Sequence, residues 1–280
     1  MSLTSHPYLG ITAAMATKHE KDKLIAPLFK DLGIEILLAP VDTDQLGTFS
    51  GEIPRVGTPH EVVIQKARLG MASGNFQFGI ASEGSIGSDP FIPFLNSDIE
   101  VMAWIDAKNN FELVESFRSF EIVAQQKIVG PKDLIDDFLV RADFPTHSLI
   151  VRSKESDGEI FKGINKRKDL DMALNKLLKE HKKIVIESDL RANHSPSRRK
   201  NIYALAERLV ARLSNLCQLC HTPGWGEVGK LFGLPCIECE EFSERAIKGF
   251  VCGCVKCDHR VEIVEEKKFI SASECSSCNP

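Results

Sequence analysis

Cysteine is absent from the first 216 of the 280 residues, and several other features are missing from the whole chain. There is no uninterrupted run of about 18 apolar residues, which argues against a membrane-spanning helix. The first ten residues lack a basic flank followed by an apolar run, so we expect no signal peptide. The net charge of −4 gives no global case for binding nucleic acid or a membrane surface.

All nine cysteines lie at or after residue 217. Eight of them form four Cys-x-x-Cys pairs, and Cys252 is left over; the pairs are Cys217/Cys220, Cys236/Cys239, Cys254/Cys257 and Cys275/Cys278. Successive pairs are separated by 15, 14 and 17 residues, which is typical of zinc sites. Disulfides require an oxidising compartment, and nothing in the sequence exports the chain, so we expect a reducing, cytoplasmic location.

Eight thiolates, with four for each metal, predict two closed, tetrahedral structural zinc sites. The spacing leaves the pairing open. Sequential pairing would join neighbouring Cys-x-x-Cys pairs, and crossed pairing would interleave them. We favour crossed pairing because it would unite the tail in one unit. Cys252 and His259 lie close enough to Cys254 to compete as ligands, and His259 is interpreted as a surface residue.

The composition changes near residue 214, which predicts an α/β domain over residues 1–213 and a zinc-binding tail over residues 214–280. Strands are predicted from the apolar runs LGITAAMA, IEILLAPV, FQFGIAS, EVMAWIDA, FELVESF, HSLIVRS and KKIVIES. Helices are predicted from the spacing in DLDMALNKLLKEH and PSRRKNIYALAERLVARL. This alternation predicts a mixed central sheet with flanking helices, followed by a small zinc-ribbon-like domain.

Two capping boxes predict helix starts, one from Thr17 to Glu20 and one from Thr58 to Glu61. Pro27 should bend or end the first helix early. The first turn offers amide donors with Lys18 and Lys21, which suits an anion such as a phosphate, although an ordinary solvated helix start explains it too. In the second helix, capping explains Glu61, whereas Lys66 is expected to lie over apolar surface with its ammonium group in a cleft.

A third candidate is the stretch GIASEGSIGSDP, residues 79–90, where Glu83 is the single carboxylate among small residues until Asp89. We interpret the stretch as a bend after a strand. Small residues would let the backbone approach a ligand, and Glu83 could hold Mg²⁺ together with phosphate oxygens. The alternative is a surface turn in which Glu83 has no role.

A fourth candidate segment lies between a strand and the last long helix, at residues 189–199. Ser195 is the expected N-cap, with Pro196 at the first helical position. The segment carries a cluster of polar candidates for anion or base binding, namely Asp189, Arg191, His194, Arg198 and Arg199. A simple ion pair between Asp189 and Arg191 on a solvated face is an equally good explanation.

Together these motifs resemble the inosine-triphosphate-pyrophosphatase-like superfamily, which includes the Maf-type enzymes, over residues 8–212. The family's A-T-x-N-x-x-K turn is similar to Ala16-Thr17-Lys18-His19-Glu20-Lys21. Its Glu followed by a Lys-Ala helix is similar to Glu61 through Lys66-Ala67. Its acidic loop is similar to Ser82-Glu83-Gly84, and its Ser-His-Arg element is similar to His194 to Arg199. Here the asparagine of the turn is missing, and Glu83 stands where the family has paired acids.

The resemblance implies a two-lobed fold and a Mg²⁺-dependent nucleoside-triphosphate pyrophosphohydrolase. In that activity Thr17, Lys18 and Lys21 would hold the triphosphate, and Lys66 would neutralise a bridging oxygen. Asp42, Asp44 and Glu61 are candidates for a second carboxylate beside Glu83. In the mechanism Glu83, with Asp42 or Glu61, would bind Mg²⁺ and position the attacking water. His194, Arg198 and Arg199 would close over the base or sugar, and Asp189 and Arg191 are further ligand-binding candidates.

The whole chain also resembles an uncharacterised bacterial family of unknown function. That family's tail pattern is C-x-x-C-x-x-P-G-[WF]-G, G-L-P-C-x-x-C, C-x-x-C and C-x-x-C-N-P. This sequence shows CQLCHTPGWG, GLPCIEC, CVKC and CSSCNP in the same order. The match implies a four-pair metal-binding tail and no particular activity.

Two classes of function therefore remain, a hydrolase of the pyrophosphatase type and a non-catalytic nucleotide- or anion-binding adaptor that docks a protein through its tail. The tail carries seven Lys and Arg against ten Asp and Glu, so DNA binding is disfavoured and protein docking preferred. Trp225 is a candidate contact there, with internal packing as the alternative. A second carboxylate within metal-bridging reach of Glu83 would favour the hydrolase.

Overall fold

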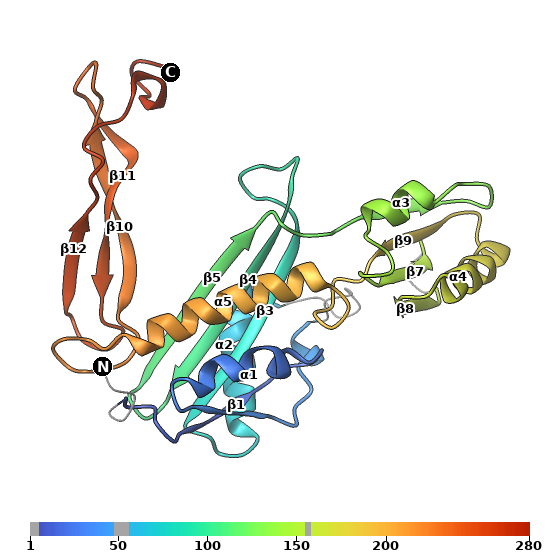
Figure 1. Cartoon of the computed structure of the whole chain (residues 1–280), viewed down its shortest axis with the longest axis horizontal. Coiled ribbons are helices and arrows are strands. Elements are labelled where there is room, and N and C mark those ends of the chain that lie inside the picture. Colours follow the sequence, from blue (N-terminus) through green and yellow to red (C-terminus); the bar gives the residue numbers. More distant parts are fainter. Residues whose placement is uncertain (1–5, 48–55, 155–157) are drawn as a thin grey trace.

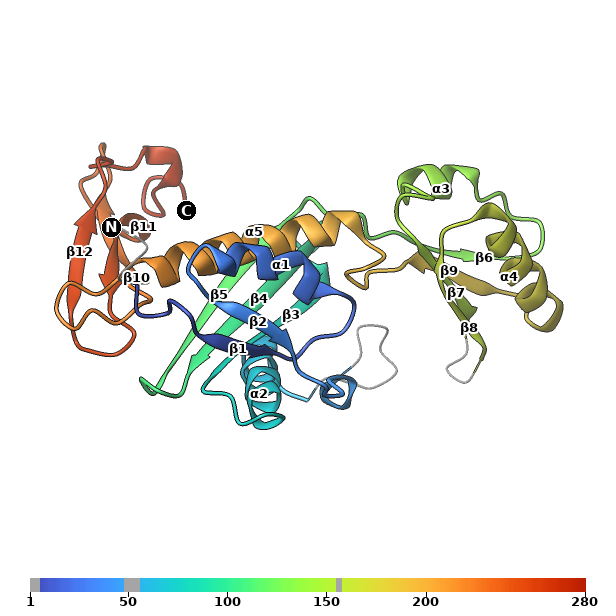
Figure 2. The ribbon, with the colours of Figure 1, turned by 60° about the horizontal axis from the view of Figure 1, so that its bottom comes forward.

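The computed structural model describes residues 6–47, 56–154 and 158–280. Figure 1 shows an elongated molecule of three parts. The body (residues 6–119 and 189–214) is built on a five-stranded sheet, the lobe (residues 126–188) on a four-stranded sheet, and the arm (residues 215–280) on a three-stranded sheet. Helix α5 (Pro196–Ser214) runs along the body from the lobe to the arm in both views (Figures 1 and 2).

The body sheet has the strand order β2-β1-β3-β4-β5. Its strands are β1 (Thr12–Met15), β2 (Glu35–Leu38), β3 (Phe78–Ser88), β4 (Asn96–Asp106) and β5 (Phe111–Ser119). Strand β1 pairs in parallel with β2 and β3, whereas β3, β4 and β5 form an antiparallel meander. The predicted mixed α/β sheet with flanking helices is therefore confirmed.

Helices cover both faces of this sheet. Helices α1 (Lys21–Lys30) and α5 pack on one face, where Phe29 and Ile202 join Trp104 of β4 in the largest apolar cluster. Helix α2 (Pro59–Ala72) packs on the other face, where Val63 meets Ala81 and Val101. Figure 2 shows α1 and α5 on one side of the strands and α2 on the other. The α2 capping box between Thr58 and Glu61 is present as predicted.

The lobe has its own antiparallel sheet, in the order β6-β9-β7-β8, and its own apolar cluster. Its elements are β6 (Gln126–Val129), α3 (Asp136–Arg141), β7 (Leu149–Ser153), β8 (Ile160–Ile164), α4 (Arg167–Glu180) and β9 (Ile184–Ser188). The sequence patterns predicted β7, α4 and β9 but not β6, α3 or β8. Strands β7 and β9 each begin with an unbroken apolar run, whereas lysine interrupts β6 and β8, and α3 is too short for helical periodicity.

Hydrogen bonds of His147 join the lobe to the start of α5. His147 Nε2 accepts the backbone N–H of Ser197 at 3.2 Å and lies 3.0 Å from Ser197 Oγ. Because Nε2 is an acceptor, Nδ1 carries the ring proton and donates to Asp143 Oδ2 at 2.9 Å. Ser195 occupies the N-cap as predicted, but its side chain makes no cap hydrogen bond. His147, far away in the sequence, performs that task for the helix.

Two predictions about the first helix are wrong. Helix α1 begins at Lys21, after His19 and Glu20 in left-handed conformations with φ of 65° and 58°, and no side chain caps it. Thr17 Oγ1 donates to the Lys18 carbonyl instead of capping the helix. The helix also continues through Pro27 to Lys30, because Ile25 and Phe29 on either side of the proline are fully buried.

The bend predicted in residues 79–90 is also wrong, because β3 extends through Ser88 and pairs with β4 along its whole length. The small residues serve another purpose. A Cβ at Gly84 would overlap both the Arg198 guanidinium and the Glu100 carboxylate, so glycine lets these two side chains pack over the strand.

The arm contains β10 (Gly226–Pro235), β11 (Phe242–Gly253) and β12 (Arg260–Val264) in sequential antiparallel order. Short 3₁₀ turns lie at Asp44–Leu46 in the body and Ala272–Glu274 in the arm. The predicted C-terminal cysteine-rich unit is therefore present. No helix of the described residues has the length and apolar character needed to cross a membrane.

Candidate metal centres and a cationic pocket

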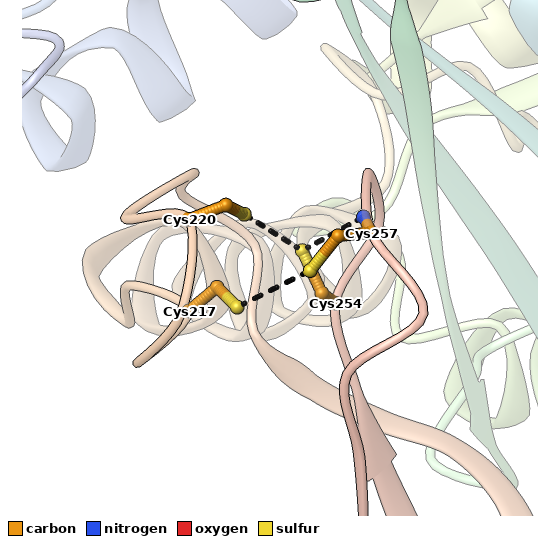
Figure 3. Close-up of side chains that lie close together, drawn as sticks. All are labelled: Cys217, Cys220, Cys254 and Cys257. Atoms are coloured by element: carbon orange, nitrogen blue, oxygen red, sulfur yellow. Dashed lines mark hydrogen bonds between the residues drawn. The ribbon is translucent and has the colours of Figure 1, made fainter.

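The first cysteine cluster forms at the base of the arm, where the chain leaves α5. Cys217 and Cys220 face Cys254 and Cys257, with sulfur–sulfur distances of 3.7 Å (Cys217–Cys257) and 3.5 Å (Cys220–Cys254), as Figure 3 shows. A tetrahedral zinc with Zn–S bonds of about 2.3 Å places its sulfurs about 3.8 Å apart. The four thiols therefore fit a structural zinc ion without rearrangement.

The second cluster comprises Cys236, Cys239, Cys275 and Cys278. Its sulfurs are 3.8 Å apart for Cys236–Cys278 and 3.7 Å apart for Cys239–Cys275. In each cluster all ligand atoms lie within 4.8 Å of one another. The geometry is consistent with two zinc sites, and all eight predicted cysteines take part.

The pairing is crossed, since the first pair meets the third and the second pair meets the fourth. Cys252 belongs to neither cluster. His259 lies half-buried beside the first cluster, with Nδ1 3.5 Å from Cys217 Sγ, and its ring lies 4.6 Å from that of Trp225. In this structure Trp225 therefore packs against the edge of the first metal centre.

A second kind of site lies where β1 ends. Strand β3 pairs with β1 only as far as Ile80 and then continues alone on that side, so Ser82 and Glu83 stand beyond the carboxyl end of β1. Ligands commonly bind at such strand ends in α/β sheets. The pocket has a volume of about 40 Å³, and its charged lining consists of Lys18, Lys21, Lys66, Arg198, Asp44 and Glu83. We call it the cationic pocket.

The cationic pocket is organised by buried contacts. Lys66 Nζ lies 2.6 Å from Glu83 Oε2, and these residues are only 8% and 7% exposed. Lys21 Nζ donates to Ser82 Oγ at 3.1 Å. At the rim, Lys18 Nζ lies 2.7 Å from Asp42 Oδ1 and also pairs with Asp44. Among the described residues, the lining thus carries four cations and two carboxylates, and Asp42 and Glu100 pair with lining cations from outside it.

Burial and charge shift the pKa values of two groups in this pocket. Burial, reinforced by the Arg198 guanidinium, lowers the pKa of Lys21 from 10.5 to about 8. Burial and the positive charges of Arg191 and Lys21 lower the pKa of His19 to about 4, so its imidazole is neutral at pH 7. The electrostatic environment favours an added negative charge.

A buried network on β4 supports Arg198 from below. Arg198 Nε lies 2.5 Å from Glu100 Oε1, and Arg198 Nη1 donates to the Leu190 carbonyl at 2.8 Å. Asp98 Oδ2 accepts from Asn201 Nδ2 at 2.8 Å, and burial together with the nearby Glu100 raises the pKa of Asp98 to about 7. These buried acids were not predicted, because acidic residues that alternate with apolar ones, as in SDIEVMAWID, are typical of a strand with its acids facing solvent.

The structure brings together Thr17, Lys18, Lys21, Lys66, Glu83 and Arg198 at the cationic pocket. Two candidates for a second carboxylate lie elsewhere. Asp42 is outside the pocket lining, and Glu61 is exposed and bonded to Thr58 in the capping box. His19, Thr43 and Ser82 line the pocket without having been predicted as site residues.

The remaining candidates lie toward the lobe. Asp189 and Arg191 form an ion pair of 2.6 Å and line a separate cavity of about 380 Å³ between body and lobe. His194 Nδ1 lies 3.2 Å from Ser148 Oγ, and Arg199 lines neither space. Strand β3 connects the two spaces, because Ser82 and Glu83 line the cationic pocket and Ile86 and Gly87 line the larger cavity.

Comparison with known proteins places these features in one family. No curated protein matches the sequence. A family model matches residues 66–280, which include β3, the lobe, α5 and both cysteine clusters. The chain therefore belongs to the family described as a domain of unknown function, DUF6671.

Proposed function

We propose that this protein binds a phosphate-bearing small molecule, such as a nucleotide, at the cationic pocket, while two zinc ions hold its arm together. The observation that carries the proposal is Lys21, a buried cation of the pocket that has no carboxylate partner among the described residues. Lys18, Lys66 and Arg198 are paired with carboxylates, whereas the Lys21 ammonium donates to the Ser82 hydroxyl, so Lys21 is the cation most ready for a ligand.

The start of α1 adds a second attraction for an anion. The helix has ten residues, and no side chain caps its first turn. Unpaired amide donors at a helix N-terminus attract anions, and a lysine side chain beside them adds a full charge. A phosphate group bound there would contact Lys21 and lie close to Arg198.

The neighbouring cavity supports a nucleotide rather than a bare phosphate. Its volume of about 380 Å³ is large enough for an organic group, and it is lined by both apolar and hydrogen-bonding side chains, including Ile150, Asn96 and Arg191. Gly87 lies four positions after Glu83 on β3, a rise of about 13 Å along a strand. A ligand with its phosphate in the cationic pocket would direct its remainder along β3 into this cavity.

Mg²⁺-dependent release of pyrophosphate from a nucleoside triphosphate is a second candidate. It is favoured by the placement of Glu83 and Lys66 in the same pocket as Lys21. Mg²⁺ would supply Lewis acidity on the phosphate chain. Glu83 would hold that ion and orient the attacking water, after exchanging its contact with Lys66. Asp44 lines the same pocket as Glu83 but pairs with Lys18, whereas Asp42 lies outside the lining and Glu61 is bonded within the capping box, so we favour binding over hydrolysis.

Calorimetric titration of the zinc-loaded chain with phosphate, pyrophosphate and a panel of nucleoside triphosphates tests the proposal. We expect Lys21→Met to weaken binding about tenfold or more, because it removes a buried cation. The control Lys23→Met, on the exposed side of the same helix, should change little. If no anion binds, or if both variants bind like the parent chain, the proposal is wrong.

Pyrophosphate release in the presence of Mg²⁺ separates the two candidates. Release by the parent chain that is lost in Glu83→Gln would establish hydrolysis. Binding without release, in both proteins, would leave the adaptor role. A thermal melt of Glu83→Gln should accompany the assay, because it alters the contact of a buried Lys66.

A further inference from the structure

An open groove separates the body from the arm, and neither the zinc sites nor the cationic pocket accounts for it. Its volume is about 1150 Å³. One wall is β5, the other is β10, and the floor includes Arg212 near the end of α5 and Trp225. Figure 1 shows the arm rising from the end of α5 beside the body sheet, with β12 on the side away from the body.

Both walls are strand edges. Strand β5 ends the body sheet, and β10 ends the arm sheet. The lining contains the consecutive residues 112–116 and 225–230. Successive side chains of a strand point to opposite faces, so a hollow lined by an unbroken run of residues follows the edge of the strand. In the described parts of the chain, no strand pairs with β5 or β10 on this side.

The groove is held in shape without a ligand. Arg212 Nη1 lies 2.5 Å from Glu115 Oε1 of β5, and Arg212 Nε donates to the Gly224 carbonyl at 3.2 Å. Lys256 Nζ donates to Asn109 Oδ1 at 3.0 Å, which is a further contact between arm and body. The first cysteine cluster lies directly beneath, because Cys254 is part of the lining. Such preorganisation lowers the entropic cost of binding.

The two edges differ in regularity. Strand β5 pairs with β4 over nine residues without a register shift. Strand β10 has shifts between Glu227 and Gly229 and again on either side of Phe232. Bulges discourage further strand pairing, whereas a regular edge presents evenly arranged N–H and carbonyl groups. The edge of β5 is therefore the better template for an added strand.

The charges of the side chains that line the groove indicate which kind of ligand it would bind. Glu112 and Glu115 are paired with Arg68 and Arg212. Arg208 and Lys230 are exposed and form no ion pair among the described residues, and Arg208 Nη1 donates to the Ser116 carbonyl of β5 at 3.3 Å. The only lining acid that is exposed and forms no ion pair among these residues is Glu227. Arg260 also lacks a carboxylate partner in the described chain and instead bonds to carbonyls around the first cluster. The exposed lining side chains without an ion-pair partner are thus mainly positive, although the arm as a whole is acidic and the metal-bound thiolates beneath the groove add negative charge.

We propose that this groove binds an extended, acidic segment of a partner polypeptide, which adds as a strand to the edge of β5. The segment's main chain would pair with β5, and its carboxylates would approach Arg208 and Lys230. Trp225 would lie along the floor beneath the bound segment. Recognition by main-chain pairing is an established mode of peptide binding at exposed sheet edges.

The test is a display library of random peptides of about ten residues, selected on the zinc-loaded full-length chain. We expect enrichment of sequences that alternate β-branched and acidic residues. In fluorescence anisotropy, the double variant Arg208→Glu/Lys230→Glu should bind an enriched peptide about tenfold more weakly or worse, because both attractions become repulsions. The matched control Lys132→Glu/Lys168→Glu, with both exposed sites in the lobe, should bind it normally.

Two further readouts separate strand addition from simple charge attraction. Amide hydrogen exchange should slow in β5 when the peptide binds, with β12 unchanged as the other free edge of the arm sheet. N-methylation of alternate residues on the pairing edge of the peptide should abolish binding. Zinc content and a thermal melt of the double variant show that its fold is intact.

The proposal is overturned if selection enriches nothing, or if enriched peptides bind the double variant as well as the parent chain. Protection confined to β12 or the lobe would place the binding surface elsewhere. Undiminished binding of the N-methylated peptide would exclude strand addition.

Discussion

The body and the arm are stabilised by different means. In the body, nineteen buried side chains form one apolar cluster around Trp104. The corresponding cluster of the arm has four members, Leu234, Cys236, Ile270 and Cys275, and two of these are metal-binding candidates. Every residue of β12 is exposed. A segment with so thin a core depends on its metal ions, whereas the body does not.

Removal of zinc should have the largest effect on stability, and it tests whether the arm depends on metal while the body does not. Structural zinc contributes about 10 kcal/mol or more to small domains of this kind. We expect chelation to unfold the arm while body and lobe stay folded. Amide hydrogen exchange with and without chelator measures this, and metal analysis of the untreated protein should give two zinc ions per chain. An arm that stays protected after the metal is lost would contradict the comparison.

Single cysteine substitutions sharpen the comparison within the arm. Cys217→Ser should remove the first zinc, which lies at the junction with α5, and loosen the attachment of the arm. Cys275→Ser should remove the second zinc and disorder the far end. Cys252→Ser should leave two bound zinc ions, since that thiol lies outside both clusters. The zinc-to-protein ratio of each variant tests which cysteines bind each zinc ion. Loss of metal in Cys252→Ser would show that the assigned ligand sets are wrong.

Trp104→Ala is the reciprocal experiment on the body. This side chain is fully buried, packs against Phe29 and Phe78, and donates its indole N–H to Tyr8. Truncating it should lower the free energy of unfolding of the body by about 3–5 kcal/mol. Urea denaturation measures the loss. The zinc content should not change. A variant that loses both the stability of the body and the bound zinc would show that body and arm unfold as one unit.

The smallest expected effect concerns Lys21. Its pKa is about 8 in the folded chain against 10.5 for the free side chain, so the unfolded state binds more protons between these values. The free energy of unfolding should therefore gain a contribution that rises with pH across that window, and Lys21→Met should flatten the rise. Phosphate affinity should fall as the pH passes about 8, because the ammonium loses its charge. Denaturation at pH 7 and pH 9.5 tests the prediction about unfolding, and calorimetry at the same pH values tests the prediction about phosphate affinity. If the free energy of unfolding changes equally with pH in the parent and in Lys21→Met, the prediction about unfolding is wrong.

Local sequence patterns predicted much of the fold. The start of α2 was predicted from the Thr58–Glu61 capping box, and the helix runs from Pro59 to Ala72, since a capping box is a local feature. The predictions failed where distant contacts override local signals. Helix α1 continues through Pro27 because the core holds both sides of that residue, and the glycine-rich stretch stays extended because β4 pairs with it.

The sequence by itself determined the eight metal-binding candidates and the mixed α/β class, because a Cys-x-x-Cys pair and an alternating apolar pattern are each complete within a few residues. Only the tertiary structure decided that the cysteine pairs cross. It also decided that Glu83 meets Lys66, that Asp42 and Glu61 stand apart from it, and that two sheet edges face one groove. Each of these depends on which distant segments pack together, and that follows from the burial of the whole chain rather than from any single motif.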